Sequence, residues 1–181
     1  FQAMLAELSI KMAISAFAAE NTAFLYDEAD LLSTSEETAL IKKLAAVSAE
    51  YEAQIVVVTM ASMDGGNIDA YVDDVYDSMG FGFGENHDGV LLLVCMDPRE
   101  YRILSNGYAG TAIGPDQIDT LCDFMETYLP NGHYATAFHS FADQSDEFLE
   151  YYQMGSPFKA GKSLAISLII GILAGVIVAF V

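Results

Sequence analysis

Two short apolar runs, both before residue 97, constrain the fold of the chain more than any other feature. Gln54–Met60 reads Gln-Ile-Val-Val-Val-Thr-Met, and Gly89–Met96 reads Gly-Val-Leu-Leu-Leu-Val-Cys-Met. Neither run alternates with polar residues, which is typical of strands buried on both faces of a sheet. Between them, Ile68–Met79 has apolar residues at helical spacing. Strand, helix and strand in this order predict a parallel pair with helices on both faces.

The rest of the chain supplies further elements around this pair. An extended piece covers residues 23–27, and Ser33-x-x-Glu36 predicts a capping box at the start of a helix. We also expect a hairpin strand over 101–105 and helices over 115–129 and 134–152, with Gly107 and Gly110 breaking the chain. The fold class is therefore α/β, a three-layer α/β/α sandwich with a mixed, partly parallel central sheet, over residues 19–154.

The C-terminal end of the sequence predicts a membrane anchor. Leu164–Val181 holds no charged residue, and as a helix it would span about 27 Å, close to the hydrocarbon thickness of a bilayer. The alternative is a buried core helix, but such a helix rarely lacks any polar face. We therefore expect a linker over 155–163 and a transmembrane helix over 164–181.

The N-terminal end has two interpretations. Ala16-Phe17-Ala18 resembles the end of an export signal, so residues 1–18 are interpreted as its remnant, although Glu7 and Lys11 interrupt the apolar stretch. An amphipathic helix is the alternative. The signal would place the domain outside the cell as a single-pass membrane protein. Lys159 and Lys162, beside the predicted anchor, favour the cytoplasm by the positive-inside rule. We expect the extracytoplasmic side.

Charge limits the possible partners. The chain has a formal net charge of −19, and the basic residues between Ala19 and Phe158 are Lys42, Lys43, Arg99 and Arg102. Nucleic acid is excluded as a partner, because phosphate binding needs clustered lysines and arginines. The same field attracts cations. Most of the carboxylates are expected to form a solvated surface.

Several classes of enzyme site are absent from the sequence. Cys95 and Cys122 do not form a CxxC pair and are interpreted as buried free thiols. Gly80-x-Gly82-x-Gly84 precedes a strand, whereas a dinucleotide fingerprint follows one, so we interpret it as a flexible loop. The sequence has no P-loop, HExxH or GxSxG motif.

Carboxylates near loops remain as candidate ligands. Asp64 and Asp97 follow the two buried strands, and ligands of open α/β sheets bind at the carboxyl ends of parallel strands. Asp27, before the first helix, could approach the same edge. Carboxylate oxygens suit Ca²⁺ or Mg²⁺, so a divalent cation is the expected cofactor. A solvated acidic face is the alternative.

An ordered set of short motifs resembles the TPM domain family. The set comprises Tyr26-Asp27-Glu28-Ala29-Asp30-Leu31-Leu32-Ser33, Ile55–Thr59, Tyr76-Asp77-x-x-Gly80-Phe-Gly82, Asp88–Val94, Arg102-Ile103, Gly107 and Gly132-x-Tyr134-x-x-Ala137-Phe138. The resemblance covers residues 22–152 and implies a compact, exported α/β/α domain, often followed by a transmembrane helix, as in membrane-anchored members of the bacterial cell envelope.

The resemblance leaves two functions open. One plant member is described as an acid phosphatase, a nematode relative modulates receptors, and some bacterial members bind divalent metal. Asp27 and Asp88 match recurrent acidic positions of the family, so with Asp64 they are the candidate metal ligands. We expect a domain that binds a divalent cation and acts through a protein partner at the envelope. The alternative is a metal-assisted phosphatase that hydrolyses phosphomonoesters; no catalytic residue can be assigned.

Overall fold

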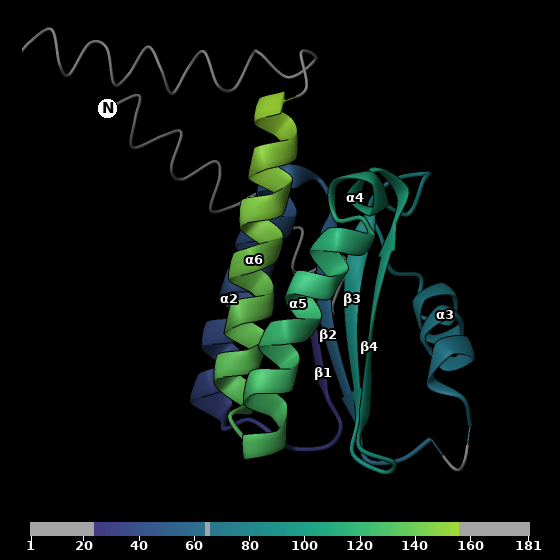
Figure 1. Ribbon diagram of the computed structural model, residues 1–181, viewed down its shortest axis with the longest axis vertical. Helices are drawn as coiled ribbons and strands as arrows, with labels where there is room; N and C mark the ends of the chain where they lie inside the picture. The colour runs from purple at the N-terminus through teal and green to yellow at the C-terminus, as the bar shows by residue number, and fades with distance from the viewer. Residues whose placement is uncertain (1–23, 64–65, 156–181) are drawn as a thin grey trace, which may run out of the picture.

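The computed structural model describes residues 24–63 and 66–155, which form a mixed α/β domain (Figure 1). Its elements are β1 (Leu25–Asp27), α2 (Thr34–Tyr51), β2 (Gln54–Met60), α3 (Ile68–Ser78), β3 (Gly89–Cys95), β4 (Glu100–Asn106), α4 (Gly107–Ala112), α5 (Pro115–Tyr128), the 3₁₀ turn η1 (Leu129–Asn131) and α6 (Tyr134–Gly155). The sheet has the order β1-β2-β3-β4, with β4 antiparallel to β3 and the other pairs parallel. The predicted mixed sheet is confirmed.

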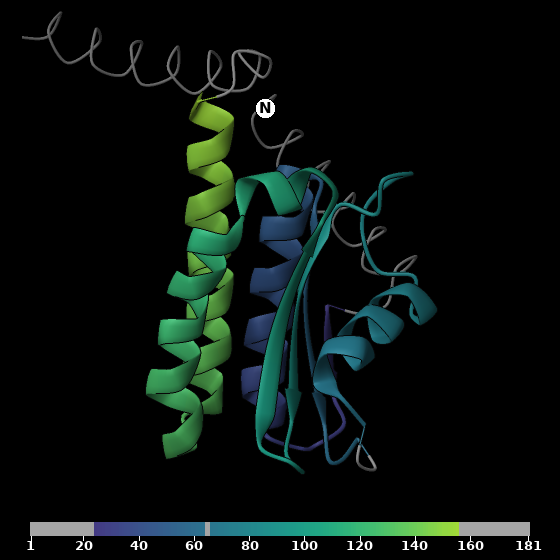
Figure 2. The ribbon, with the colours of Figure 1, turned by 45° about the vertical axis from the view of Figure 1, so that its right-hand side comes forward.

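Helices cover both faces of this sheet. Figures 1 and 2 show α2, α5 and α6 on one face and α3 on the other. Val57 and Leu92 belong to the core under α2, α5 and α6, whereas their neighbours Val58 and Leu93 belong to the core under α3. Because successive side chains of a strand point to opposite faces, two covered faces require continuously apolar strands. This explains why β2 and β3 are buried along their whole length.

The start of α2 is fixed by the predicted capping box. The backbone N–H of Ser33 donates to Glu36 Oε2 at 2.8 Å, and the Ser33 hydroxyl donates to the same oxygen at 2.6 Å. These bonds, led by the one from the Ser33 side chain, lower the pKa of Glu36. In the capping box the Ser33 side chain also accepts from the Glu36 backbone N–H, which satisfies a donor at the helix start that has no partner within the helix.

One helix was not predicted. The sequence indicated a break at Gly107 and Gly110, yet residues 107–112 form α4. Two glycines weaken a helix of this length, so its stability must come from tertiary contacts. Asp88 Oδ1 accepts a hydrogen bond of 2.6 Å from the Tyr108 N–H, in the first turn of α4. Gly107 has φ +62°, a conformation that glycine adopts without strain.

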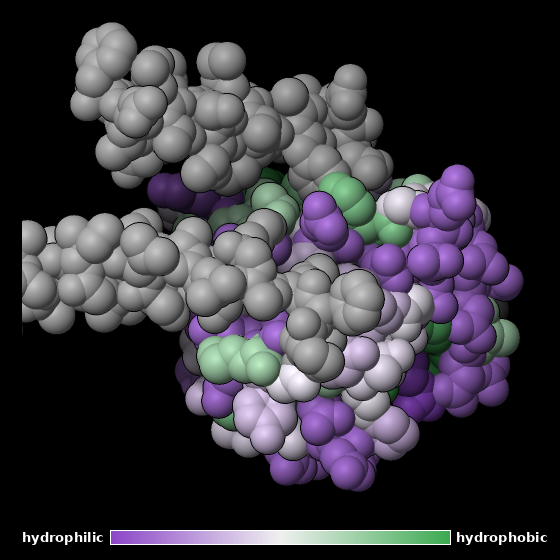
Figure 3. Space-filling view, turned by 90° about the horizontal axis from the view of Figure 1, so that it is seen from above, coloured by the Kyte–Doolittle hydropathy of each residue, from purple (hydrophilic) through white to green (hydrophobic). Residues whose placement is uncertain are grey.

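Several predictions fall on other parts of the chain. The predicted export-signal remnant and transmembrane helix, and Asp64 in the loop after β2, lie outside the described residues. Within residues 24–63 and 66–155, no helix is long and apolar enough to cross a membrane. From the end where α6 finishes, the uncovered surface of the domain is mostly hydrophilic, with small separate apolar patches (Figure 3).

Candidate binding groove at the sheet edge

Asp27, the first of the predicted ligands, holds the chain between β1 and α2. Its Oδ1 accepts hydrogen bonds from the Leu31 N–H at 3.2 Å and the Thr59 hydroxyl at 2.5 Å, and its Oδ2 accepts from the Leu32 N–H at 2.8 Å. The Thr59 hydroxyl oxygen accepts in turn from the Ala29 N–H at 3.2 Å. A carboxylate offers about four acceptor positions, so most of the capacity of Asp27 serves this turn.

Asp88, the second predicted ligand, has a comparable structural role at the start of β3. Besides the bond from Asp88 Oδ1 to α4, its backbone carbonyl accepts from the N–H groups of Gln54 at 2.9 Å and Phe83 at 2.8 Å. The glycine-rich segment before it is a tight turn, in which Gly82 N–H donates to Gln54 Oε1 at 2.7 Å. The turn leads into a strand, as the sequence predicted, and is held by hydrogen bonds to β2.

Asp27 and Asp88 lie at opposite ends of the sheet. Asp27 is paired with Thr59 near the carboxyl end of β2, whereas Asp88 bonds to Gln54 at the amino end of the same strand. Five residues of strand correspond to about 17 Å, and the oxygen ligands of Ca²⁺ lie ~2.3–2.6 Å from the ion. The two carboxylates therefore cannot share one cation. Among the residues that the structure describes, no group of three His, Cys, Asp or Glu side chains could hold a metal ion.

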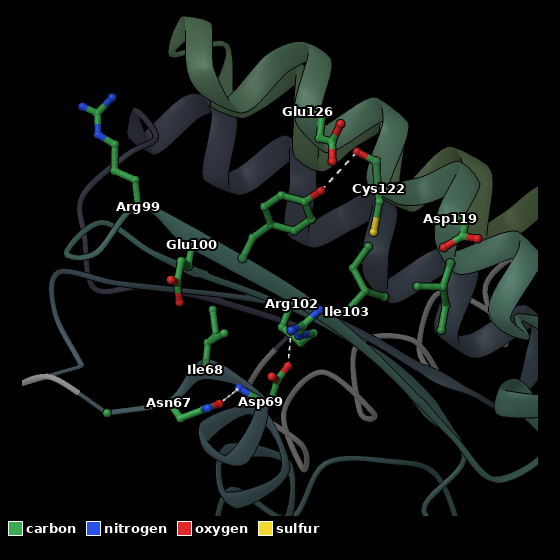
Figure 4. A pocket seen from close by; sticks show the side chains of 13 residues that line it. Asn67, Ile68, Asp69, Arg99, Glu100, Arg102, Ile103, Asp119, Cys122 and Glu126 are labelled. Atoms are coloured by element: carbon green, nitrogen blue, oxygen red, sulfur yellow. Dashed lines mark hydrogen bonds and ion pairs between the residues drawn. The ribbon is translucent and has the colours of Figure 1, made fainter.

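A large recess lies elsewhere, along the outer edge of β4. It has a volume of about 850 Å³ and runs between the start of α3 and the middle of α5 (Figure 4). Its floor is the first half of β4, one wall carries Asn67, Ile68 and Asp69, and the other carries Ile118, Asp119, Cys122 and Glu126. We call this recess the β4 groove. A second recess of about 480 Å³ shares Arg99, Glu100, Tyr101 and Glu126 with it and continues around the β3–β4 turn toward Tyr134.

The polar groups of the β4 groove are arranged on its two walls. Arg102 forms an ion pair with Asp69 of α3, whose backbone N–H is capped by Asn67 Oδ1 at 2.8 Å. From the floor, the Tyr101 hydroxyl donates to the Cys122 backbone carbonyl at 3.3 Å; Cys122 lies on the opposite wall, formed by α5 (Figure 4). Burial raises the pKa of the Tyr101 phenol and of the Cys122 thiol. Both groups are therefore neutral at physiological pH, and Cys122 is a poor nucleophile there, because the thiolate is the reactive form.

Sequence reasoning missed this groove and misplaced one of its residues. Cys95 is a buried free thiol as predicted, but Cys122 is a free thiol that is partly exposed and lines the groove. The spacing of Asp119, Cys122 and Glu126 places them on one stripe of α5. That stripe was the available signal, but the sequence does not show that it faces the edge of a sheet.

The sequence comparison identifies the family. Residues 25–148 match the model of the TPM domain. The chain belongs to the TPM domain family. The resemblance inferred from the ordered motifs is thus confirmed over most of the described region. No curated protein sequence matches the chain.

Three solved structures share the fold of this TPM domain. The N-terminal domain of a protein from P. gingivalis has a TM-score of 0.65 at 22% identity, covering 74% of this chain and 86% of its own. The BA42 protein from the psychrophilic bacterium Bizionia argentinensis has a TM-score of 0.60 at 16% identity, covering 67% and 83%. The N-terminal domain of the cg2496 protein from Corynebacterium glutamicum has a TM-score of 0.57 at 17% identity, covering 69% and 78%. At these identities the similarity establishes the fold alone.

Proposed function

We propose that this TPM domain is a binding module, held at the outer side of a cell membrane, that engages a protein partner through the β4 groove. The observation that carries this proposal is the position of the β4 groove, a recess of about 850 Å³ at an open sheet edge between two walls that carry charged side chains. Open sheet edges and their flanking grooves are surfaces on which proteins recognise one another.

The end of α6 supports the membrane part of this proposal. Tyr151 is 80% exposed and Met154 is 70% exposed on its last turns, shortly before the charge-free run 164–181. Aromatic residues with an apolar body and a polar tip are enriched at membrane–water interfaces. A Tyr and a Met that are mostly exposed at this place suit a helix end that approaches a bilayer.

The hydrolase alternative has less support from the geometry. A metal-assisted phosphatase needs ligands and a water-activating group that converge on one phosphoryl group. The candidate ligands Asp27 and Asp88 each hold a turn, about 17 Å apart along the sheet. In the β4 groove the raised pKa of Cys122 disfavours thiolate chemistry. No observation on the described residues favours this function over binding.

Divalent cation binding stays a prediction from the sequence. Asp27 keeps about one of its acceptor positions available, and its neighbours Glu28 and Asp30 are exposed carboxylates. A calorimetric titration with Ca²⁺ at ordinary ionic strength tests it. Saturable binding that Asp27→Ala removes would establish a site, whereas weak heats that fade with salt would leave only a diffuse ion atmosphere.

The membrane and partner parts of the proposal need separate tests. For the membrane part, Thr136→Cys in a Cys122→Ser background should react with a membrane-impermeant maleimide in intact cells, and the chain should stay in carbonate-washed membranes. Absence of labelling until the cells are lysed would contradict the outward orientation. Thr136 is exposed on α6, so access to it depends on the side of the membrane.

For the partner part, a photo-crosslinking amino acid at Glu100, on the rim of the groove, is compared with one at Glu147 on α6. Both positions are exposed. A protein adduct formed from position 100 and absent from position 147 is the expected result. Equal adducts from both positions, or phosphomonoester hydrolysis that survives purification and is lost on Asp27→Ala without loss of folding, would overturn the binding function.

A further inference from the structure

The two edges of the sheet differ in a way that makes one of them available for pairing. At one edge β1 has only three residues, Leu25–Asp27, and very short edge strands are a common protection against unwanted pairing. At the other edge β4 has seven residues, Glu100–Asn106, paired with β3 in an uninterrupted register that contains no bulge and no proline. No described strand pairs with its outer side. Alternate N–H and C=O groups of β4 therefore point into the β4 groove.

From these features we propose that the β4 groove receives an extended, cationic segment of a partner protein, which adds to the sheet as a fifth strand beside β4. This inference rests on the proposed partner-binding function and names its mode and chemistry. Backbone pairing with an open edge supplies affinity, and pockets for alternate side chains supply selectivity.

The side chains of β4 show which wall of the groove would contact each side chain of such a segment. Tyr101 and Ile103 pack on the side of α5, whereas Arg102 pairs with Asp69 of α3. Alternate residues of an added strand would therefore face α5 and α3 in turn. The α5 wall presents Asp119 and Glu126, seven residues or about 10 Å apart along the helix axis. Two residues of a strand that share a face lie ~7 Å apart, within reach of both carboxylates for lysine or arginine.

Charge decides against a second copy of this chain as the occupant. An added β4 from another copy would bring a domain of the same net charge, −19 for the whole chain, against the acidic α5 wall. Arg102 is already paired with Asp69, so it adds little net positive charge to the groove. Like charges at close range oppose association, whereas a cationic segment is attracted and steered to the same site.

The probe is the peptide acetyl-Thr-Lys-Val-Lys-Val-Lys-Thr-amide, carrying a fluorophore and titrated with the chain at physiological ionic strength. Because a strongly acidic protein attracts any cation, two N-methylated versions serve as controls. In one the amides of the lysines are methylated, and in the other the amides of the valines. Only one alternate set can pair with β4, so one version should bind like the parent and the other at least tenfold more weakly. Equal affinities for both versions would overturn the proposal.

Charge variants and hydrogen exchange locate the bound peptide. Asp119→Asn with Glu126→Gln should weaken binding about fivefold, as expected from two exposed ion pairs. The matched pair Glu147→Gln with Glu150→Gln on α6 should leave it unchanged. At saturation, alternate backbone amides of β4 should exchange more slowly and those of β1 should not. Unchanged exchange along β4, or equal effects of the two double variants, would refute the added strand.

Two further outcomes separate this inference from the proposed function. Adducts from position 100 together with failure of the peptide experiments would keep the partner-binding function and reject the added strand. Slowed β4 exchange that depends on protein concentration in the absence of peptide would show a second copy on this edge, and would reject a cationic partner segment as the occupant.

Discussion

Replacing Asp27 with alanine tests whether this carboxylate is primarily a structural group. The change removes the acceptor for the Leu31 and Leu32 N–H groups and for the Thr59 hydroxyl. A hydrogen bond to a charged group contributes ~1.5–3 kcal/mol, but Asp27 is half-buried and water can replace part of the loss. Allowing about 1 kcal/mol for each bond, we expect the free energy of unfolding to fall by roughly 3 kcal/mol. For a domain of this size the unfolding midpoint should drop by about 9 °C.

The assay is thermal unfolding followed by circular dichroism, with Glu28→Gln as the matched control. Glu28 is an exposed neighbour of the same charge, and a surface change of this kind should alter stability by less than ~0.5 kcal/mol. Thr59→Val removes the partner hydroxyl, so the two variants combined should cost less than the sum of their separate effects. The structural role would be refuted if the midpoint of Asp27→Ala were close to that of Glu28→Gln. If, in addition, Ca²⁺ raised the midpoint of the unsubstituted chain but not that of Asp27→Ala, Asp27 would be a metal ligand.

Three other predictions concern separate parts of the domain. Gly107→Ala should destabilise the domain by ~2–3 kcal/mol in chemical denaturation, because the new Cβ would overlap the Asp88 carboxylate at a φ of +62°. The control Gly84→Ala has a similar φ of +65° but open space around it, so it should cost only about 1 kcal/mol. Burial raises the pKa of Tyr108 from 10.0 to about 12, so the neutral phenol is favoured in the folded state. Stability measured by denaturant titration should therefore fall as pH rises from about 10 toward 12, and it should fall less steeply in Tyr108→Phe. A thiol reagent should titrate Cys122 but not the buried Cys95 in the native protein, slowly at neutral pH because the Cys122 pKa is raised; reaction of both thiols at one rate would contradict the packing of β3.

The elements with the strongest patterns were predictable from the sequence. The predicted strand Gln54–Met60 has the bounds of β2, and the Ser33–Glu36 capping box lies at the start of α2. These features depend on neighbouring residues, so a local pattern describes them fully. Helix α4 was not predictable in this way, since its first turn is held by Asp88, twenty residues earlier in the chain.

The candidate site was less predictable for the same reason. Asp27 was correctly expected near the carboxyl ends of the strands, but its hydrogen bond to Thr59 joins residues 32 positions apart. The sequence could not show that this contact uses most of the carboxylate's capacity. It also placed Cys122 among buried residues, because an apolar stripe on α5 does not reveal where the sheet beneath it ends. The β4 groove exists only through the packing of α3 and α5 around an open edge.

The length of α6 sets how far the groove stands from whatever follows the domain. The helix has 22 residues, or about 33 Å. Tyr134 at its beginning lines the second recess, which shares Arg99 and Glu100 with the β4 groove. Its other end lies at the opposite end of the domain, beside α4 (Figure 1). If the chain enters a bilayer after Gly155, α6 acts as a stalk that holds the mouth of the groove roughly one bilayer thickness above the lipid. A partner embedded in the same membrane would then need a tail of comparable height to reach it, and a partner free in the surrounding compartment would not.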